Sequence, residues 1–353
     1  MNTDPDYLAH LAAYRKAGQE AKPLLRIVRD GETVRRPSPA AMAAAQVEEA
    51  IQRGKLDFSV FPRFAWPSLA ELLGPLMPGS VVVLGAGTAQ GKTSFLLTEM
   101  DDLQRQGRGT LYVPLETEPR DCRRRWAAWS LGYDWEAVNE NRWSDLPPGA
   151  EDRIGETMIE QARDARVQFV PERTLNIGDL TDWVRWGIEE AGTQCVVIDH
   201  LHQLDVAGFR TYREAVIAFM RQLKALAQEY EVPILIASQI TQSLDPFDRY
   251  LPPSLDPLRE SAAIKENADI VLMLSRRMRH DVEMAPATLK ALYQAGKCER
   301  DLADPDTMVV TCRKHRVRDS KAADRSVLLR VTPSGRVEER YGPVSPAYRW
   351  GAE

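Results

Sequence analysis

Hydrophobic residues gather in short runs along the middle of the chain, and stretches with helical spacing separate these runs. The runs cover residues 80–85, 109–116, 166–171, 195–199, 232–238 and 268–274. Each is rich in valine, isoleucine and leucine and is short enough to be one strand. Near-continuous apolar strands that alternate with helices predict a mostly parallel sheet covered on both faces. We therefore expect an α/β fold.

The C-terminal part of the chain has a different pattern. Residues 307–316 and 326–340 alternate in the manner of strands, and the second segment contains the turn residues Pro333, Ser334 and Gly335. Such a pattern is typical of antiparallel strands joined by tight turns. We expect these strands to extend one edge of the sheet.

The N-terminal residues predict a short helical extension. An Asp-Pro pair at 4–5 and a Ser-Pro pair at 38–39 are each typical of a helix start, and the second opens an alanine-rich helix over 39–53. The polar residues 21–36 between them are expected to form a connection. The predicted organisation is a helical extension (1–60), a main α/β domain (61–343) and a C-terminal tail (344–353).

Composition and charge limit the functions that are open to this chain. The formal net charge is −5, so any contact with nucleic acid must be local. No apolar run is long enough to cross a bilayer and the start has no secretory pattern, so we expect a cytoplasmic protein without membrane contact. The four cysteines are scattered without a Cys-x-x-Cys pair, which argues against a zinc site or a disulfide framework.

A glycine-rich loop follows the first strand and precedes a helical run, which is the context of a P-loop. Ala86 occupies the place of the first glycine in that motif, so a plain glycine-rich turn stays open as an alternative. In a P-loop, backbone N–H groups and the helix start hold phosphate, and Lys92 reaches the outer phosphates. The predicted nucleotide-binding residues are Gly87, Thr88, Ala89, Gln90, Gly91, Lys92, Thr93 and Ser94.

Asp199 ends the apolar strand 195–199 and is a second candidate part of the same site. Together with the Thr93 hydroxyl it can hold Mg²⁺, although a strand can also end in aspartate for capping reasons. His200 and His202 flank this strand end and suggest a metal site, but no third ligand with suitable spacing is evident nearby.

Several segments resemble, in the expected order, the DnaB-type replicative DNA helicases, a family within the RecA-like P-loop ATPases. The segments that carry the resemblance are 113–118 (VPLETE), 219–240, 258–274 and 313–316 (RKHR). The resemblance spans about residues 66–340 and implies a RecA-like core that binds ATP and Mg²⁺ and hydrolyses ATP.

The same resemblance implies roles for individual residues. Glu116 matches the general base that activates the attacking water, and Gln239 matches a polar sensor between the nucleotide and the DNA-facing loop. Lys314 and Arg316 match a pair that enters the nucleotide site of a neighbouring subunit. Each residue also has a purely structural alternative. Glu116 could be a surface glutamate, Gln239 could be a polar strand end, and Lys314 and Arg316 could belong to a solvated basic strand.

The resemblance also implies partners. The loops at about 205–213 and 242–258 are expected to face single-stranded DNA, with Arg210, Arg213 and Arg249 as DNA-binding residues. Family members act as homo-oligomers, commonly ring-shaped hexamers, and meet a helicase loader or a primase. The Arg123-Arg124-Arg125 run beside Trp126 and Trp129 resembles a nucleic-acid patch, but a helix with inward tryptophans and arginines facing solvent or a phosphate site is favoured.

Two departures from the family are evident. Residues 1–60 stand where replicative members usually carry a large helical domain, and the helix over 39–53 is expected to dock on a neighbouring subunit. Residues 279–306 look like an insertion, for which we have no function. The expected function is an ATP-dependent translocase or helicase on single-stranded DNA. A filament-forming RecA-like recombination or remodelling ATPase and a nucleotide-switched assembly module stay open.

Overall fold

The computed structural model describes residues 57–164, 166–172, 175–201, 205, 207–240, 262–276 and 306–340, together with the strand backbones at 25–29, 32–36 and 348–349. The chain divides into two units, Met1–Val60 and Phe61–Glu353, and each is described by itself.

The first unit contains a β-hairpin. Strands β1 (Leu25–Arg29) and β2 (Glu32–Arg36) pair in antiparallel register, from Leu25 opposite Arg36 to Arg29 opposite Glu32. The prediction of a polar connection over 21–36 was therefore wrong for these residues. The Asp-Gly pair between the two strands is a recognised hairpin signal that the sequence interpretation missed. The two helices expected in this unit lie outside the described residues, and the short 3₁₀ helix η1 (Phe58–Val60) ends the unit.

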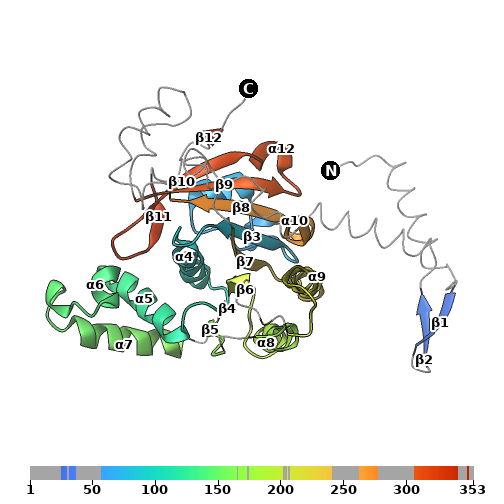
Figure 1. The fold of residues 1–353 in the computed structure, drawn as a ribbon, viewed down its shortest axis with the longest axis horizontal. Coiled ribbons are helices and arrows are strands. Elements are labelled where there is room, and N and C mark those ends of the chain that lie inside the picture. Colours follow the sequence, from blue (N-terminus) through green and yellow to red (C-terminus); the bar gives the residue numbers. More distant parts are fainter. Residues whose placement is uncertain are drawn as a thin grey trace. The chain divides into compact units, whose positions relative to one another are not determined.

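Among the described residues of the second unit, ten strands form one mixed sheet in the order β11-β10-β9-β8-β3-β7-β6-β4-β5, with β12 paired to β10 (Figure 1). The strands with parallel neighbours are β3 (Val81–Ala86), β4 (Thr110–Pro114), β5 (Val167–Phe169), β6 (Cys195–Asp199), β7 (Ile234–Gln239) and β8 (Ile270–Ser275). The antiparallel strands are β9 (Thr307–His315), β10 (Arg325–Val331), β11 (Val337–Glu339) and β12 (Tyr348–Arg349). The predicted parallel sheet with antiparallel C-terminal strands is confirmed.

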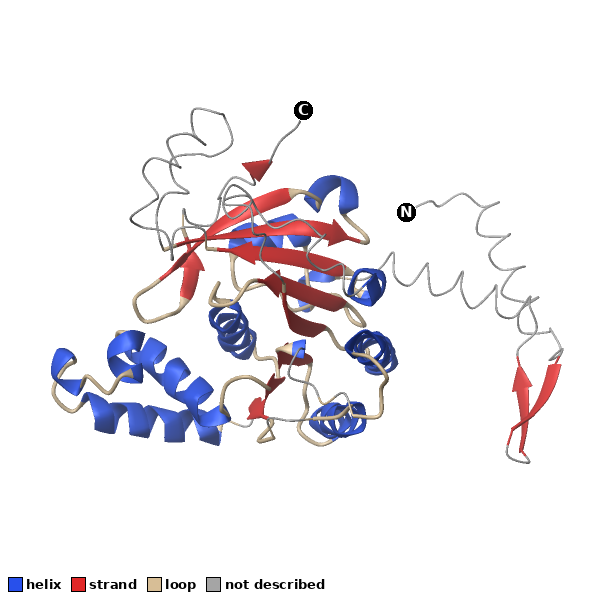
Figure 2. Cartoon of the chain, viewed as in Figure 1, coloured by secondary structure: helices blue, strands red, loops and turns tan. Residues whose placement is uncertain are grey.

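Helices cover both faces of this sheet (Figure 2). The side chains of β3 alternate between the two faces, since Val82 and Leu84 belong to a hydrophobic cluster with α4, whereas Val81 and Val83 belong to another with α8 and α9. This alternation follows from the two-residue period of a strand. The helices are α3 (Pro67–Leu73), α4 (Lys92–Arg105), α5 (Pro119–Leu131), α6 (Trp135–Asn139), α7 (Ala150–Arg163), α8 (Ile177–Glu189), α9 (Tyr212–Tyr230), α10 (Ala262–Asn267) and α12 (Asp319–Ala322), and the short 3₁₀ helix η2 (Trp143–Asp145) precedes α7.

Helices α5, α6 and α7 pack around a small core of their own beside the sheet. Tyr133, Val138 and Ile154 are buried in this core. Trp126 and Trp129 of α5 are 2% and 5% exposed and belong to the main cluster, so the prediction that these tryptophans point inward is confirmed. Among the helices of the described part of the chain, none is long and apolar enough to cross a membrane.

Candidate active site

The parallel register delivers four loops to one edge of the sheet. Ala86 at the end of β3 lies opposite Gln239 at the end of β7, and Pro114 of β4 lies opposite Asp199 of β6. Because parallel strands share their direction, the residues that follow these ends meet at the same edge. The structure therefore brings together the P-loop, Glu116, Asp199 and Gln239, which the sequence analysis had selected separately.

The P-loop has the backbone that phosphate binding needs. Gly91 has a φ of +97° and is followed at once by α4, which begins at Lys92. The positive φ favours glycine, and a Cβ atom here would lie 2.7 Å from Met308 Cε, so the methionine side chain would have to move. Lys92 Nζ donates hydrogen bonds to the carbonyl oxygens of Ala86 (3.3 Å) and Gly87 (3.0 Å), which holds the ammonium over the loop. A helix N-terminus beside an ammonium group is suited to an anion.

The environment of Lys92 balances burial against negative charge. The residue is 7% exposed, and burial lowers the pKa of its amine, while the carboxylates of Asp199 and Glu116 act in the opposite direction. Burial is the larger effect, and the two carboxylates offset part of it. A bound phosphate would add to that stabilisation.

Asp199 fits the role of a cation ligand. It is 1% exposed, Tyr112 Oη donates a 3.0 Å hydrogen bond to its Oδ2, and the Thr93 hydroxyl also bonds to the carboxylate. Burial raises the pKa of this carboxyl group. Within the described residues, Asp199 Oδ1 is buried without a hydrogen-bond partner. A buried oxygen of this kind calls for a positive ligand, so Thr93 and Asp199 fit the predicted Mg²⁺.

Glu116 lies beside Asp199 and His200. Glu116 Oε2 is 3.1 Å from His200 Nδ1, and the glutamate side chain is 49% exposed while that of His200 is 2% exposed. One ligand atom from each of Glu116, Asp199 and His200 lies within 4.8 Å of the others, which is close enough for all three to hold one metal ion. The sequence interpretation found no third ligand near His200, and the fold supplies Glu116 from the segment that follows β4. His202 lies outside the described residues.

Gln239 connects the end of β7 to the P-loop. Its Nε2 donates a 2.9 Å hydrogen bond to the Thr88 hydroxyl. On the other side of the loop, the Gln90 side-chain oxygen accepts a hydrogen bond from the backbone N–H of Arg276 at the end of β8. Two polar side chains therefore tie the P-loop to neighbouring strands.

A cleft of about 690 Å³ opens over the P-loop, and its outer wall was not selected from the sequence. Arg125 of α5 donates a 2.6 Å hydrogen bond to Ser94 Oγ, and its guanidinium lies 5.3 Å from the ring centroid of Trp135. The backbone N–H of Trp135 donates to the Pro333 carbonyl oxygen (3.0 Å), and a Cβ atom at Gly335 would lie 3.2 Å from Arg125 Nη2. Of the two destinations expected for the arginine run, Arg125 faces the phosphate site.

Lys314 and Arg316 lie at the opposite end of the sheet from the P-loop of their own chain. Lys314 Nζ donates to the Ala268 carbonyl oxygen (2.7 Å), and Arg316 Nη1 is 3.2 Å from Asp269 Oδ1. Asp269 Oδ2 accepts from the N–H of Val81, at the first residue of β3. The P-loop follows the other end of β3, five residues later, or about 17 Å along the strand. The side chain of Arg316 is 52% exposed.

The predicted DNA-binding arginines are only partly described. Arg210 and Arg213 are exposed at the start of α9, where the Thr211 hydroxyl caps the helix by accepting from the N–H of Glu214. Arg249 and the whole of the loop at 242–258 lie outside the described residues.

Comparison with known proteins agrees with this geometry. The family described as DnaB-like helicase C terminal domain matches residues 65–319. Relatives include a probable plasmid replicative DNA helicase of Chlamydia psittaci, which is 25% identical over 64% of this chain and 48% of its own length. The replicative DNA helicase DnaB of Pasteurella multocida is 26% identical over 57% of this chain and 43% of its own length. The chain spans about half the length of the curated relatives that it matches.

Two solved structures share the fold. One is an ATPase domain with a TM-score of 0.63 at 18% identity, and the match covers 86% of this chain and 99% of that one. The other is a DnaB-like replicative helicase, described with its interactions with primase, with a TM-score of 0.64 at 19% identity over 88% of this chain and 68% of that one. The P-loop and the acidic residues beside it thus lie in a RecA-like ATPase fold, and the chain belongs to the family of DnaB-like helicase C-terminal domains.

Proposed function

We propose that this protein is an ATP-driven translocase that moves along single-stranded DNA and unwinds duplex as an oligomeric ring. The observation that carries the proposal is the meeting of Lys92, Asp199 and Glu116 at one edge of the sheet, in a domain of the DnaB-like family. This set supplies a phosphate ligand, a cation ligand and a base for attack on the γ-phosphate.

Each residue has a separate task in this proposal. Lys92 and the N–H groups at the start of α4 bind and orient the phosphates. Thr93 and Asp199 hold Mg²⁺, which when bound neutralises charge on the phosphates. Glu116 takes the proton of the attacking water, and His200 Nδ1, at 3.1 Å, orients its carboxylate.

We propose further that each site is completed by a neighbouring copy of the chain. Arg316 lies at the far end of β3 from its own P-loop and half exposed, so it is poised to act outside its own subunit. A contact that pairs the P-loop edge of one copy with the Arg316 edge of the next is head-to-tail, and such contacts close into rings when the rotation permits. A hexamer is the proposed closed form.

DNA contact is proposed for the loops at the P-loop edge. Arg210 and Arg213 are exposed near the start of α9, which follows β6 and Asp199. Arg249 belongs to the segment that follows Gln239 and is proposed as the third contact. A small number of cationic contacts is compatible with a net charge of −5, because binding depends on the local neutralisation of DNA phosphates. A helicase loader or a primase is the proposed protein partner.

Strand displacement on a forked duplex tests this function, with ATP hydrolysis measured with and without single-stranded DNA. We expect DNA-stimulated hydrolysis and ATP-dependent displacement, both lost in Lys92→Ala. Stimulation with filaments and no displacement would favour a recombination or remodelling ATPase. Hydrolysis that DNA does not change would instead indicate a nucleotide-switched assembly module.

A further inference from the structure

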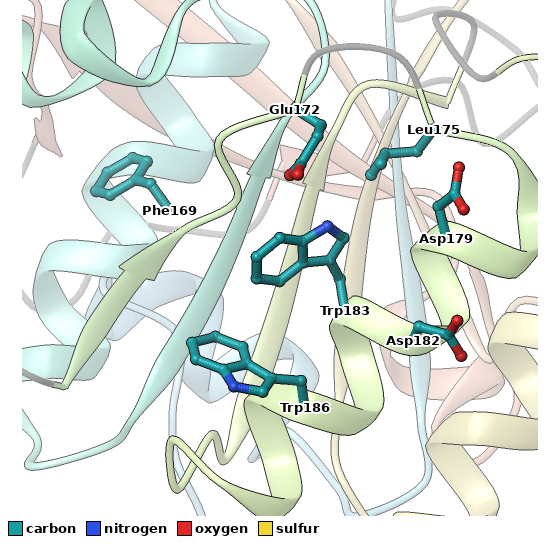
Figure 3. Close-up of a pocket in the computed structure, with 7 residues that line it drawn as sticks. All are labelled: Phe169, Glu172, Leu175, Asp179, Asp182, Trp183 and Trp186. Atoms are coloured by element: carbon teal, nitrogen blue, oxygen red, sulfur yellow. The ribbon is translucent and has the colours of Figure 1, made fainter.

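A second cavity, of about 700 Å³, lies at the edge of the sheet between the end of β5 and helix α8 (Figure 3). It is lined by Phe169, Glu172, Leu175, Asp179, Asp182, Trp183 and Trp186. None of these residues lines the nucleotide cleft, so the two cavities are separate. We call these seven residues the α8 pocket.

The sequence of α8 builds two different stripes. Asn176 caps the helix by accepting hydrogen bonds from the N–H groups of Gly178 (2.8 Å) and Asp179 (3.0 Å). The buried stripe that packs on the sheet consists of Leu180, Thr181, Val184 and Gly187. The other stripe has the spacing i, i+3, i+4, i+7 and consists of Asp179, Asp182, Trp183 and Trp186. The helix therefore presents two carboxylates and two indoles away from the main core.

The two tryptophans form a partly exposed aromatic surface. Their rings meet edge to face, with centroids 5.3 Å apart and an interplanar angle of 85°. Trp183 packs in part against the core, but Trp186 is 41% exposed. A large exposed indole beside a cavity is typical of an interaction surface, because core packing does not require it.

Three carboxylates lie in the lining of the same pocket. The carboxylate of Glu172 lies above the indole of Trp183, and Asp179 and Asp182 stand along the neighbouring side of α8 (Figure 3). Asp179 accepts a hydrogen bond from Asn176 Nδ2 (2.7 Å). Of the seven residues of the α8 pocket, three carry carboxylates and none is basic, while the guanidinium of Arg123 lies over the ring of Phe169. The lining itself therefore favours a cation over an anion.

One aromatic ring of the pocket already carries a cation. The guanidinium of Arg123, a partly buried side chain, lies 4.6 Å from the ring centroid of Phe169. The rings of Trp183 and Trp186 could accept a cation in the same way, and the carboxylates of the pocket would add to the attraction. Lysine and arginine fit such a surface because their alkyl stems lie along an indole while their charged ends reach carboxylates.

From this combination we propose that the α8 pocket docks a basic amphipathic peptide segment of a partner protein. The segment places the alkyl stem of a lysine or arginine against Trp186 and its charged end near Glu172, and the carboxylates of α8 add to the attraction. Apolar side chains of the same segment fill the cavity between Phe169 and Leu175. The pocket shares no residue with the nucleotide cleft, so we expect this docking to leave ATP hydrolysis unchanged.

The test uses the full chain and a capped synthetic peptide with lysine and leucine at helical spacing, titrated by calorimetry. Its charge-reversed counterpart carries glutamate in place of each lysine. We expect saturable binding of the lysine peptide and none of the counterpart. Trp186→Ala and the double variant Glu172→Gln/Asp182→Asn should each weaken binding about tenfold.

The matched control is Glu156→Gln/Glu160→Gln, which removes the same charge from exposed positions on α7. It should bind the peptide within about twofold of the unchanged chain, a difference well below 1 kcal/mol. ATP hydrolysis should be unchanged in all variants, which would show that they fold. A failure of peptide binding can then be distinguished from a failure of the proposed ATPase function.

Three results would overturn the docking proposal. One is the absence of saturable binding to the unchanged chain. Another is equal affinity in the pocket variants and the α7 control. The third is that Trp186→Ala changes the oligomer mass while the unchanged chain does not bind the peptide, which would make the pocket a contact between copies of this chain.

Discussion

The Gln239 amide donates a 2.9 Å hydrogen bond to the Thr88 hydroxyl, so the last residue of β7 is tied to the P-loop. β7 leads directly into the segment proposed to contact DNA. A change in that segment can therefore reach the P-loop through this side chain. This contact gives the proposed coupling between DNA and ATP a specific physical link.

Gln239→Ala removes this link while leaving the phosphate ligands in place. We expect ATP hydrolysis without DNA to stay within about threefold of the unchanged protein, since a lost neutral hydrogen bond is worth roughly 1 kcal/mol. Stimulation by single-stranded DNA should be largely lost. Gln228→Ala, at an exposed position on α9, is the control. Full stimulation in the Gln239 variant would exclude it as the coupling residue.

Glu116→Gln tests the general base. An amide keeps the size of the side chain but cannot take a proton, so ATP binding should persist while turnover falls about a hundredfold or more. Glu118→Gln is the matched control, because Glu118 lies two residues away and pairs with Arg120 at the start of α5 (2.7 Å). Single-turnover hydrolysis separates the chemical step from binding. A loss of less than about tenfold in the Glu116 variant would move the base elsewhere.

Arg125→Ala tests the wall of the nucleotide cleft. Arg125 contacts Ser94 and Trp135 in the cleft, whereas the adjacent Arg124 donates to the Val138 carbonyl oxygen (2.7 Å) and faces away. We expect titration with a fluorescent ATP analogue to show about tenfold weaker binding in Arg125→Ala, because a charged donor is lost. Arg124→Ala should bind normally. Equal affinity in the two variants would remove Arg125 from the site.

The buried carboxyl of Glu99 predicts a pH-dependent stability. Burial raises the pKa of Glu99 from 4.5 to about 8, although its Oε2 accepts a 3.0 Å hydrogen bond from the N–H of Ala65. The folded state therefore keeps a proton that the unfolded state has lost between pH 4.5 and about 8. The contribution of Glu99 to the free energy of unfolding is therefore complete below pH 4.5, the unfolded pKa, and is lost as the pH rises through about 8, the folded pKa.

Glu99→Gln removes this dependence because the amide stays neutral. Urea unfolding at pH 5.5 and pH 8 should show that the variant gains stability relative to the unchanged protein at the higher pH, by an amount on the order of a few kcal/mol. Glu71→Gln, at an exposed position, should follow the unchanged protein at both values. The same difference in stability at both pH values would contradict the predicted protonation.

The sequence predicted the sheet well because its central strands are buried on both faces, and such strands appear in the sequence as short apolar runs. It also predicted the P-loop, since glycine positions such as Gly91 and the following Lys92 are local features. The close approach of the Met308 side chain from β9 to Gly91 depends on the tertiary fold and could not be predicted locally.

Other features depend on contacts that the sequence does not reveal. The arginine run suggested a phosphate-facing side chain but not which arginine supplies it, because Arg125 reaches Ser94 from a different helix. Trp135 is held by Pro333 from a distant turn, so no local pattern marks it as part of the cleft. Glu116 and His200 follow the ends of different strands, β4 and β6, which hid their proximity. The hairpin of β1 and β2 did have a local signal, the Asp-Gly pair, but charged residues on both strands obscured it.

The measurement that most directly tests the central claim is ATP hydrolysis by mixtures of Lys92→Ala and Arg316→Ala, with and without single-stranded DNA. Each variant alone should be nearly inactive. Lys92→Ala lacks the phosphate-binding lysine, and Arg316→Ala lacks an inserted arginine, which is worth roughly 10³–10⁵ in rate in P-loop systems. In mixed oligomers, verified by mass measurement, some interfaces pair an intact P-loop with an intact Arg316. The account predicts that these interfaces recover part of the DNA-stimulated activity. No recovery in oligomers that contain both variants would contradict a site shared between neighbouring copies.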